Sequence, residues 1–155
     1  GFKQFLAVLD DGRIAISALA VGLAQGCLDV SRRYALQRHT FGAPIGSRQA
    51  VAFSLSDVAV AVEAARLLTY KAAWLKDSGR PSAEAKQAAA IAKLYSTEAA
   101  VSATRVATQV FGGNGFMEEF PVARFYRDAK VLEIGEGTSE VQRMVIARGL
   151  GLPVQ

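Results

Sequence analysis

The chain has 155 residues, of which 51% are hydrophobic and 21% charged, and 18 basic and 14 acidic side chains give a net charge of +4. This length predicts one domain with a buried core. The basic side chains form no dense stripe of the kind that binds nucleic acid. A single cysteine and a single histidine exclude an internal disulfide and a zinc cluster, so we expect no metal.

The first predicted helix spans residues 12–38. Asp10 and Asp11 precede it as N-capping residues. Arg13 in its first turn would lie at the unfavourable end of the helix dipole, which hints at an anion or a salt bridge with Asp10. The apolar run 14–28 falls short of the roughly 20 residues of a membrane span. No signal peptide is visible, so we expect a reduced cytoplasmic setting and no span.

Small residues recur along this helix at a spacing of four, at Ala18, Gly22 and Gly26. Residues four apart share a helix face, so these three predict a groove that another helix can approach closely. Because most other faces are apolar too, we expect the helix to be central in the fold. Cys27 lies in the same run and is expected to be a small buried residue.

Two further long helices are predicted next. A loop at 41–46, with one proline and two glycines, leads into a helix at 48–77. Gly79 follows the end of that helix, and a third helix runs over 82–111. Its segment 101–110 is rich in β-branched residues, but no turn signal precedes it, which favours helix over strand.

The glycine-rich segment 112–115 ends the third helix. A dinucleotide fingerprint would need a strand before it, so we expect a helix cap and a turn, with backbone N–H groups facing an anionic ligand as the alternative. A short fourth helix begins near Pro121 and carries charges up to Lys130, and a fifth spans 140–148. The predicted fold is therefore all-α, an antiparallel helical bundle.

Glu136 is the most informative single residue, because it lies between Gly135 and Gly137. Glycines let a backbone come close to a ligand, and a desolvated carboxylate is a stronger base than an exposed one. An acid near a helix N-terminus, capped by Thr138 or Ser139, is an equally good interpretation. Both remain open from these residues alone.

Whole phrases of the chain, in their order, resemble the C-terminal domain of the acyl-CoA dehydrogenases, flavoenzymes that desaturate acyl-CoA thioesters. These phrases occupy residues 10–14, 37–42, 48–50, 109–115, 126–130 and 136–143. The resemblance covers nearly the whole chain and implies a single helical-bundle domain over 1–155. It also implies a larger enzyme, whose N-terminal helical domain and middle β domain are expected outside this chain.

The resemblance implies a role for each matching residue. Glu136 would be the catalytic base that removes the proton α to the thioester carbonyl, while hydride passes to FAD. Gly137 would let the backbone approach the thioester. The other matches are Thr138 and Glu140 at the flavin of the same subunit, Arg38, Phe41, Gln49, Gln109, Gly112 and Gly113 at the FAD of a neighbouring subunit, and Asp10 and Arg13 near the pantetheine arm of CoA.

Two positions bear on the base and on the acyl pocket. Some family members carry the base at the position of Gly12, where glycine cannot serve, so Glu136 is the expected base. Many members have tyrosine at the position of Gly135. Because that ring lines the acyl pocket, its absence implies a roomier pocket and a bulky or branched acyl group.

The function expected from the resemblance is α,β-desaturation of an acyl-CoA, with an electron-transfer flavoprotein or a similar acceptor as redox partner. The resemblance also implies a homodimer or homotetramer, and a chain that is inactive by itself. Two alternatives remain open. One is an acyl-CoA oxidase-like flavoprotein, and the other is a non-catalytic oligomerisation bundle, which the small-residue face and the high apolar content permit.

Overall fold

A computed structural model describes residues 2–79 and 82–154 of the chain, and the side chains of 11–79 and 83–154. Its elements follow in chain order: α1 (Phe2–Gln37), β1 (His39–Thr40), β2 (Ala43–Pro44), η1 (Ile45–Ser47), α2 (Gln49–Asp77), α3 (Ser82–Phe111), η2 (Gly112–Gly115), α4 (Pro121–Ile134) and α5 (Ser139–Gly149). The prediction of an all-α helical bundle is confirmed, and so is helix rather than strand over 101–110.

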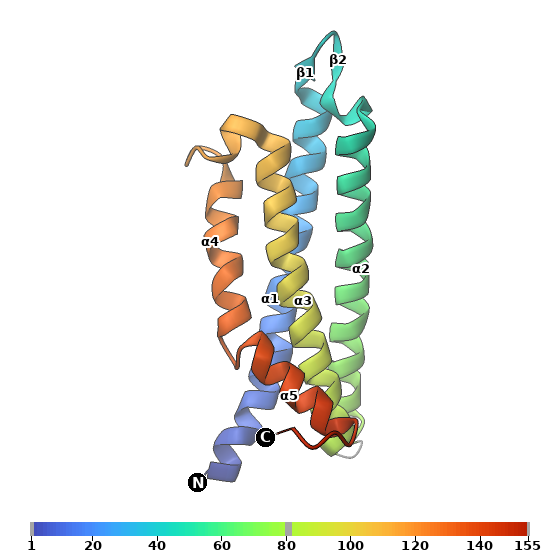
Figure 1. Cartoon of the computed structure of the whole chain (residues 1–155), viewed down its shortest axis with the longest axis vertical. Helices are drawn as coiled ribbons and strands as arrows, with labels where there is room; N and C mark the ends of the chain where they lie inside the picture. The colour runs from blue at the N-terminus through green and yellow to red at the C-terminus, as the bar shows by residue number, and fades with distance from the viewer. Residues whose placement is uncertain (1, 80–81, 155) are drawn as a thin grey trace.

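The three long helices lie side by side along the long axis, with α4 beside them and α5 crossing the end opposite the β1–β2 hairpin (Figure 1). Every other α-helix contacts α3, whereas α1 contacts α2, α3 and α4. The helix at the centre of the bundle is therefore α3, and α1 keeps one side open.

The main core is rich in alanine, whose small side chain lets the helices approach closely. Its buried members are Ala20, Ala24, Cys27, Val58, Val62, Ala100, Ala103, Ala107, Phe111, Val122, Ala129 and Leu132. Cys27 is 1% exposed, which confirms the expectation from the sequence. Burial raises the pKa of the Cys27 thiol to about 12, so the thiol is protonated at neutral pH.

The start of α1 differs from the prediction, because the helix begins at Phe2 rather than at Gly12. Asp11 is therefore not an N-cap. It lies inside the helix and forms an ion pair with Lys76 of α2, a contact that offsets the low helix propensity of aspartate. Asp10 also lies inside α1, so it is not an N-cap either. Its side chain falls outside the described residues, and so does its expected salt bridge with Arg13.

The small-residue face of α1 forms an apolar groove against α4, with a volume of about 1010 Å³. A Cβ at Gly26 would lie 3.7 Å from Phe125 Cε2, whereas one at Gly22 would meet nothing within 4 Å. The predicted groove is present, but within the described residues no helix fills it at Gly22.

Residues 11–37 of α1 are long and apolar enough to cross a membrane by length and composition alone, because an 18-residue window within them has a mean hydropathy of 1.6. The sequence predicts no membrane span here. Core helices of bundles pass it as well, and α1 packs against three other helices, so the result is weak evidence for a span.

Candidate functional site

The predicted site residues fall into two groups at opposite ends of the fold (Figure 1). The carboxylate-end group surrounds the α4–α5 loop and comprises Arg13, Glu136, Gly137, Thr138 and Glu140. The hairpin-end group comprises Arg38, Phe41, Gln49, Gln109, Gly112 and Gly113. The 14 residues of α4, about 20 Å of helix, lie between them, so one chain does not bring all these residues into one site.

The loop that carries Glu136 has two consecutive residues in the left-handed region, Glu136 with φ 54° and Gly137 with φ 93°. For a residue with a Cβ this conformation costs about 1–2 kcal/mol. The loop then enters α5, where the Thr138 side chain accepts from Val141 N at 3.5 Å. Of the two capping residues that the sequence allowed, the structure selects Thr138.

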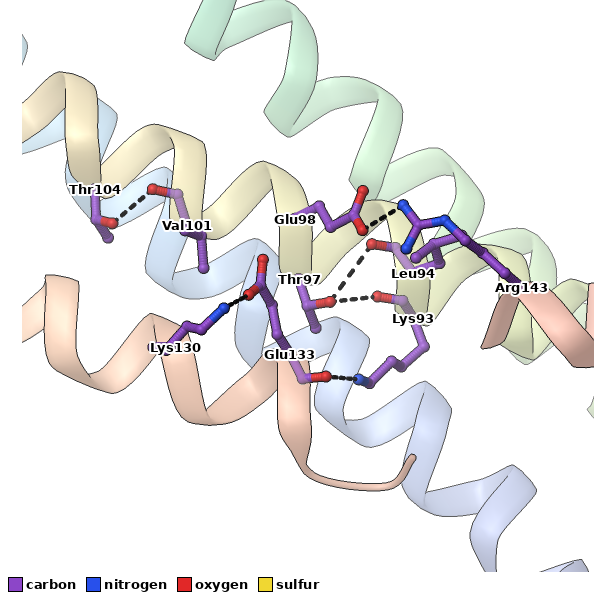
Figure 2. A network of polar contacts seen from close by, with 9 residues as sticks. All are labelled: Lys93, Leu94, Thr97, Glu98, Val101, Thr104, Lys130, Glu133 and Arg143. Carbon is purple, nitrogen blue, oxygen red and sulfur yellow. Dashed lines mark hydrogen bonds and ion pairs between the residues drawn. The ribbon is translucent and has the colours of Figure 1, made fainter. Parts of the chain in front are cut away.

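Two buried side chains that the sequence interpretation missed bind the backbone of this loop. Lys93 Nζ donates to Glu133 O at 2.9 Å and to Gly137 O at 2.8 Å, and Figure 2 shows it reaching from α3 to the end of α4. Gln142 Nε2 donates to Glu136 O at 3.1 Å and to Gly137 O at 2.8 Å. Both Lys93 and Gln142 are 0% exposed.

The charges around Lys93 are mixed. Burial is the main cause that lowers the pKa of Lys93, and Arg13 lowers it further, while the carboxylates of Glu133, Glu136 and Glu140 raise it. Arg13 itself is 5% exposed. The carboxylate end therefore has two buried cations beneath three acidic side chains.

Gly12 of α1 leaves the room that the Glu136 side chain occupies. A Cβ added at Gly12 would lie 2.5 Å from Glu136 Cδ, which real contacts do not allow. The two positions that the family resemblance offered for a base are thus neighbours in space. At Gly135, by contrast, an added Cβ would meet only Val131 O, at an ordinary 3.5 Å.

The hairpin end has a different character. β1 and β2 are joined by Phe41 and Gly42 with φ 51° and 79°, the two positive values of a type I′ turn. Phe41 is 96% exposed. Its ring lies 5.8 Å from the Arg48 guanidinium, which also donates to Thr40 O at 3.3 Å. The sequence predicts a loop here, whereas the structure has the strand pair β1–β2.

An open pocket of about 760 Å³ lies between the start of α2 and the end of α3, and Arg48, Arg105 and Gln109 are among the residues that line it. Gly112 has φ 59° and ends α3, as predicted. Neither Gly112 nor Gly113 would meet another atom within 4 Å if a Cβ were added. Arg38 and Gln49 are exposed too, so this end presents cations and bare backbone to solvent.

Known proteins are similar to this chain in sequence and in fold. The family described as "Acyl-CoA dehydrogenase, C-terminal domain" matches residues 1–151. A probable acyl-CoA dehydrogenase of Bacillus subtilis (strain 168) is 55% identical over 150 residues, 97% of this chain and 39% of that protein. The mitochondrial short-chain specific acyl-CoA dehydrogenase of Bos taurus is 50% identical over 147 residues, 95% of this chain and 35% of that protein.

The solved structure of butyryl-CoA dehydrogenase from Megasphaera elsdenii is similar with a TM-score of 0.93 and 45% identity, over 97% of this chain and 38% of that one. The chain thus spans less than two fifths of the length of these relatives. On the family match over 151 residues and on these identities, the chain belongs to the acyl-CoA dehydrogenase family and corresponds to its C-terminal domain.

Proposed function

We propose that the chain is the C-terminal part of an FAD-dependent acyl-CoA dehydrogenase, in which Glu136 removes the α-proton of an acyl-CoA thioester. The observation that carries this proposal is the strained backbone of Glu136, with φ 54°, held by hydrogen bonds from buried side chains. A strained backbone of this kind persists only where the surrounding contacts hold it in place, and such residues are most frequent at functional sites.

The chain's own residues prepare Glu136 for this role. Gly12 leaves space for the carboxylate, and the absence of a Cβ at Gly137 leaves room for the Gln142 side chain that holds the loop. The approach of a thioester to the Gly137 backbone stays a prediction. The predicted contacts of Asp10 and Arg13 with the pantetheine arm stay predictions. Because Arg13 is buried, we propose that it acts mainly through the electrostatics of the loop.

The hairpin end fits a diphosphate-bearing cofactor such as FAD. Exposed guanidinium groups of Arg38, Arg48 and Arg105 and the uncovered backbone of Gly112 and Gly113 suit an anion. When bound, FAD supplies the hydride acceptor for the β-carbon.

The distance between the two ends supports a site to which two subunits contribute different residues. Thr138 and Glu140 lie beside Glu136 and would serve the flavin of the same subunit. The hairpin-end group, about one α4 length away (about 20 Å), would serve the FAD of a neighbouring subunit. A single 155-residue chain would then have no complete site, and we expect the purified chain to show no flavin absorbance.

Glu136→Gln in the FAD-loaded full-length protein tests the base assignment. The amide cannot accept the proton, so we expect turnover to fall by roughly 10²- to 10⁴-fold, with flavin absorbance retained. Glu119→Gln, at an exposed acid in the loop before α4, is the control and should behave as wild type. Wild-type turnover in Glu136→Gln would refute the proposal.

The electron acceptor separates the dehydrogenase from its closest alternative. A dehydrogenase passes electrons to an electron-transfer flavoprotein or a redox dye, whereas an oxidase passes them to dioxygen and forms hydrogen peroxide. We propose the first, and stoichiometric hydrogen peroxide during acyl-CoA turnover would favour the oxidase instead.

We further propose that the acyl pocket is roomy enough for a bulky or branched acyl group. Gly135 has φ −61° and ψ 153°, which any residue can adopt, and a Cβ there meets no close atom. Gly135→Tyr should therefore fold normally and narrow the pocket. We expect it to lower kcat/KM for branched acyl-CoAs more than for straight ones, while a wild-type preference for short straight chains would refute the proposal.

Self-association of the chain is proposed from α2. Phe53, Val60, Leu67 and Trp74 recur every seven residues and are each more than half exposed, which makes an apolar stripe suited to helix packing. We propose a second copy as its occupant, in a dimer or tetramer. Light scattering of wild type and Leu67→Glu tests this, since a monomeric wild type would contradict it.

A further inference from the structure

Lys93 and Gln142 have no part in the proton transfer itself, yet both hold the backbone around Glu136. They come from different helices, α3 and α5, and both donate to the same acceptor, Gly137 O, at 2.8 Å each. Lys93 also binds Glu133 O, and Gln142 also binds Glu136 O. Four hydrogen bonds from two fully buried side chains thus hold the backbone on both sides of Glu136.

The position of Lys93 is not explained by helix packing. Its neighbours Ala89, Ala90 and Ala92 are buried and apolar, and a buried ammonium is unfavourable unless it is well paired. Glu133 O belongs to the last turn of α4, where the helix dipole favours a cation. That one contact would suffice to join α3 to α4, whereas the second bond, to Gly137 O, reaches past the helix into the loop.

Gln142 also binds the backbone of the loop. Its Nε2 donates to two carbonyls, while its buried Oε1 has no hydrogen-bond partner among the described residues. A buried acceptor left unsatisfied is destabilising. The amide thus leaves Oε1 unsatisfied in an arrangement that directs Nε2 at the backbone of Glu136 and Gly137.

These contacts determine where the Glu136 carboxylate lies. A left-handed backbone at Glu136 sends its side chain toward Gly12, and any relaxation of the loop would turn the side chain away. We propose that Lys93 and Gln142 are positioning residues, which fix the Glu136 carboxylate by holding the carbonyl oxygen of Gly137. This inference rests on the proposed function, in which Glu136 is the base.

Lys93→Met and Gln142→Met test the inference, because methionine keeps an unbranched chain and removes the donor. Lys86→Met, at an exposed lysine of the same helix, is the matched control. In the FAD-loaded full-length protein, we expect flavin reduction by acyl-CoA in a single turnover to slow roughly ten- to hundredfold, with KM within about twofold of the control because substrate contacts are unchanged.

Hydrogen exchange on the same proteins gives a readout that does not depend on activity. We expect faster exchange in residues 135–142 and control-like exchange in residues 100–110 of α3. A control-like reduction rate in either folded variant would overturn the inference, and so would faster exchange spread evenly over α1–α3, since that indicates a role in general stability. If Lys93→Met does not fold, Gln142→Met decides alone.

Glu136→Gln, measured in parallel, separates this inference from the proposed function. Loss of reduction in Glu136→Gln with normal reduction in Lys93→Met and Gln142→Met would overturn only the positioning role. Normal reduction in Glu136→Gln would overturn the base assignment itself.

Discussion

The two ends of the bundle hold a strained non-glycine residue each, and they support it in opposite ways. Glu136 has φ 54° and Phe41 has φ 51°. The loop at Glu136 is held by Lys93 and Gln142, both fully buried. Phe41 is 96% exposed, and the guanidinium of Arg48 lies 5.8 Å from its ring.

This difference indicates which part of a site the chain completes by itself. The carboxylate end is built from α1, α3, α4 and α5, so the contacts that hold its loop come from one chain. The hairpin end presents an aromatic ring, arginines and bare glycines to solvent, an arrangement suited to a surface that something else covers. The predictions below test this contrast.

The largest expected effect comes from alanine at two left-handed glycines. Gly137→Ala should lose about 1–2 kcal/mol of unfolding free energy from strained backbone, and roughly 1–3 kcal/mol more because its Cβ would lie 2.9 Å from Gln142 Nε2. Gly42→Ala at the hairpin has φ 79° and no atom within 4 Å, so it should lose only the first amount. Denaturant unfolding measures both, and equal losses would refute the contrast.

A smaller effect concerns pH and the buried charge of Lys93. Burial lowers the Lys93 pKa in the folded chain from its ordinary 10.5, so between the lowered value and 10.5 the unfolded chain binds more protons. Stability relative to Lys93→Met should therefore rise with pH across that interval, by at most about 1.4 kcal/mol per pH unit. Unfolding free energies of both proteins at several pH values check this, and a flat difference would contradict it.

The smallest effect on stability is expected at the hairpin tip. Phe41→Ala removes an almost fully exposed ring, so the unfolding free energy should change by less than about 0.5 kcal/mol. In the FAD-loaded full-length protein the same change should weaken FAD retention, measured as flavin lost on gel filtration. A large loss of stability would show that the hairpin end is supported from within.

The fold could be predicted where the chain carries clear local signals. Glycine and proline near positions 42–46, 79–81 and 112–115 locate the ends of α2 and α3 to within a residue or so. The start of α1 was missed because Asp10 and Asp11 look like caps, while the ion pair of Asp11 with Lys76 is a tertiary contact. The hairpin was missed because phenylalanine is unusual in a type I′ turn.

The candidate site could be predicted in its ligand-facing residues and not in its supports. Glu136 stands out because of its flanking glycines. Lys93 is 44 residues away from Gly137, and its only signal was a single charge within an apolar stretch of α3. Gln142 is close in sequence, but only the fold shows that its side chain turns back under the loop.

Cys27 gives the molecule a practical property. It is the only cysteine of the chain, it is 1% exposed, and burial keeps its thiol protonated because the pKa is about 12. Maleimide reagents would therefore leave the wild-type chain unlabelled. A cysteine introduced at Phe41 would be the one reactive thiol, so a dye attached there could report in solution when a second molecule covers the hairpin.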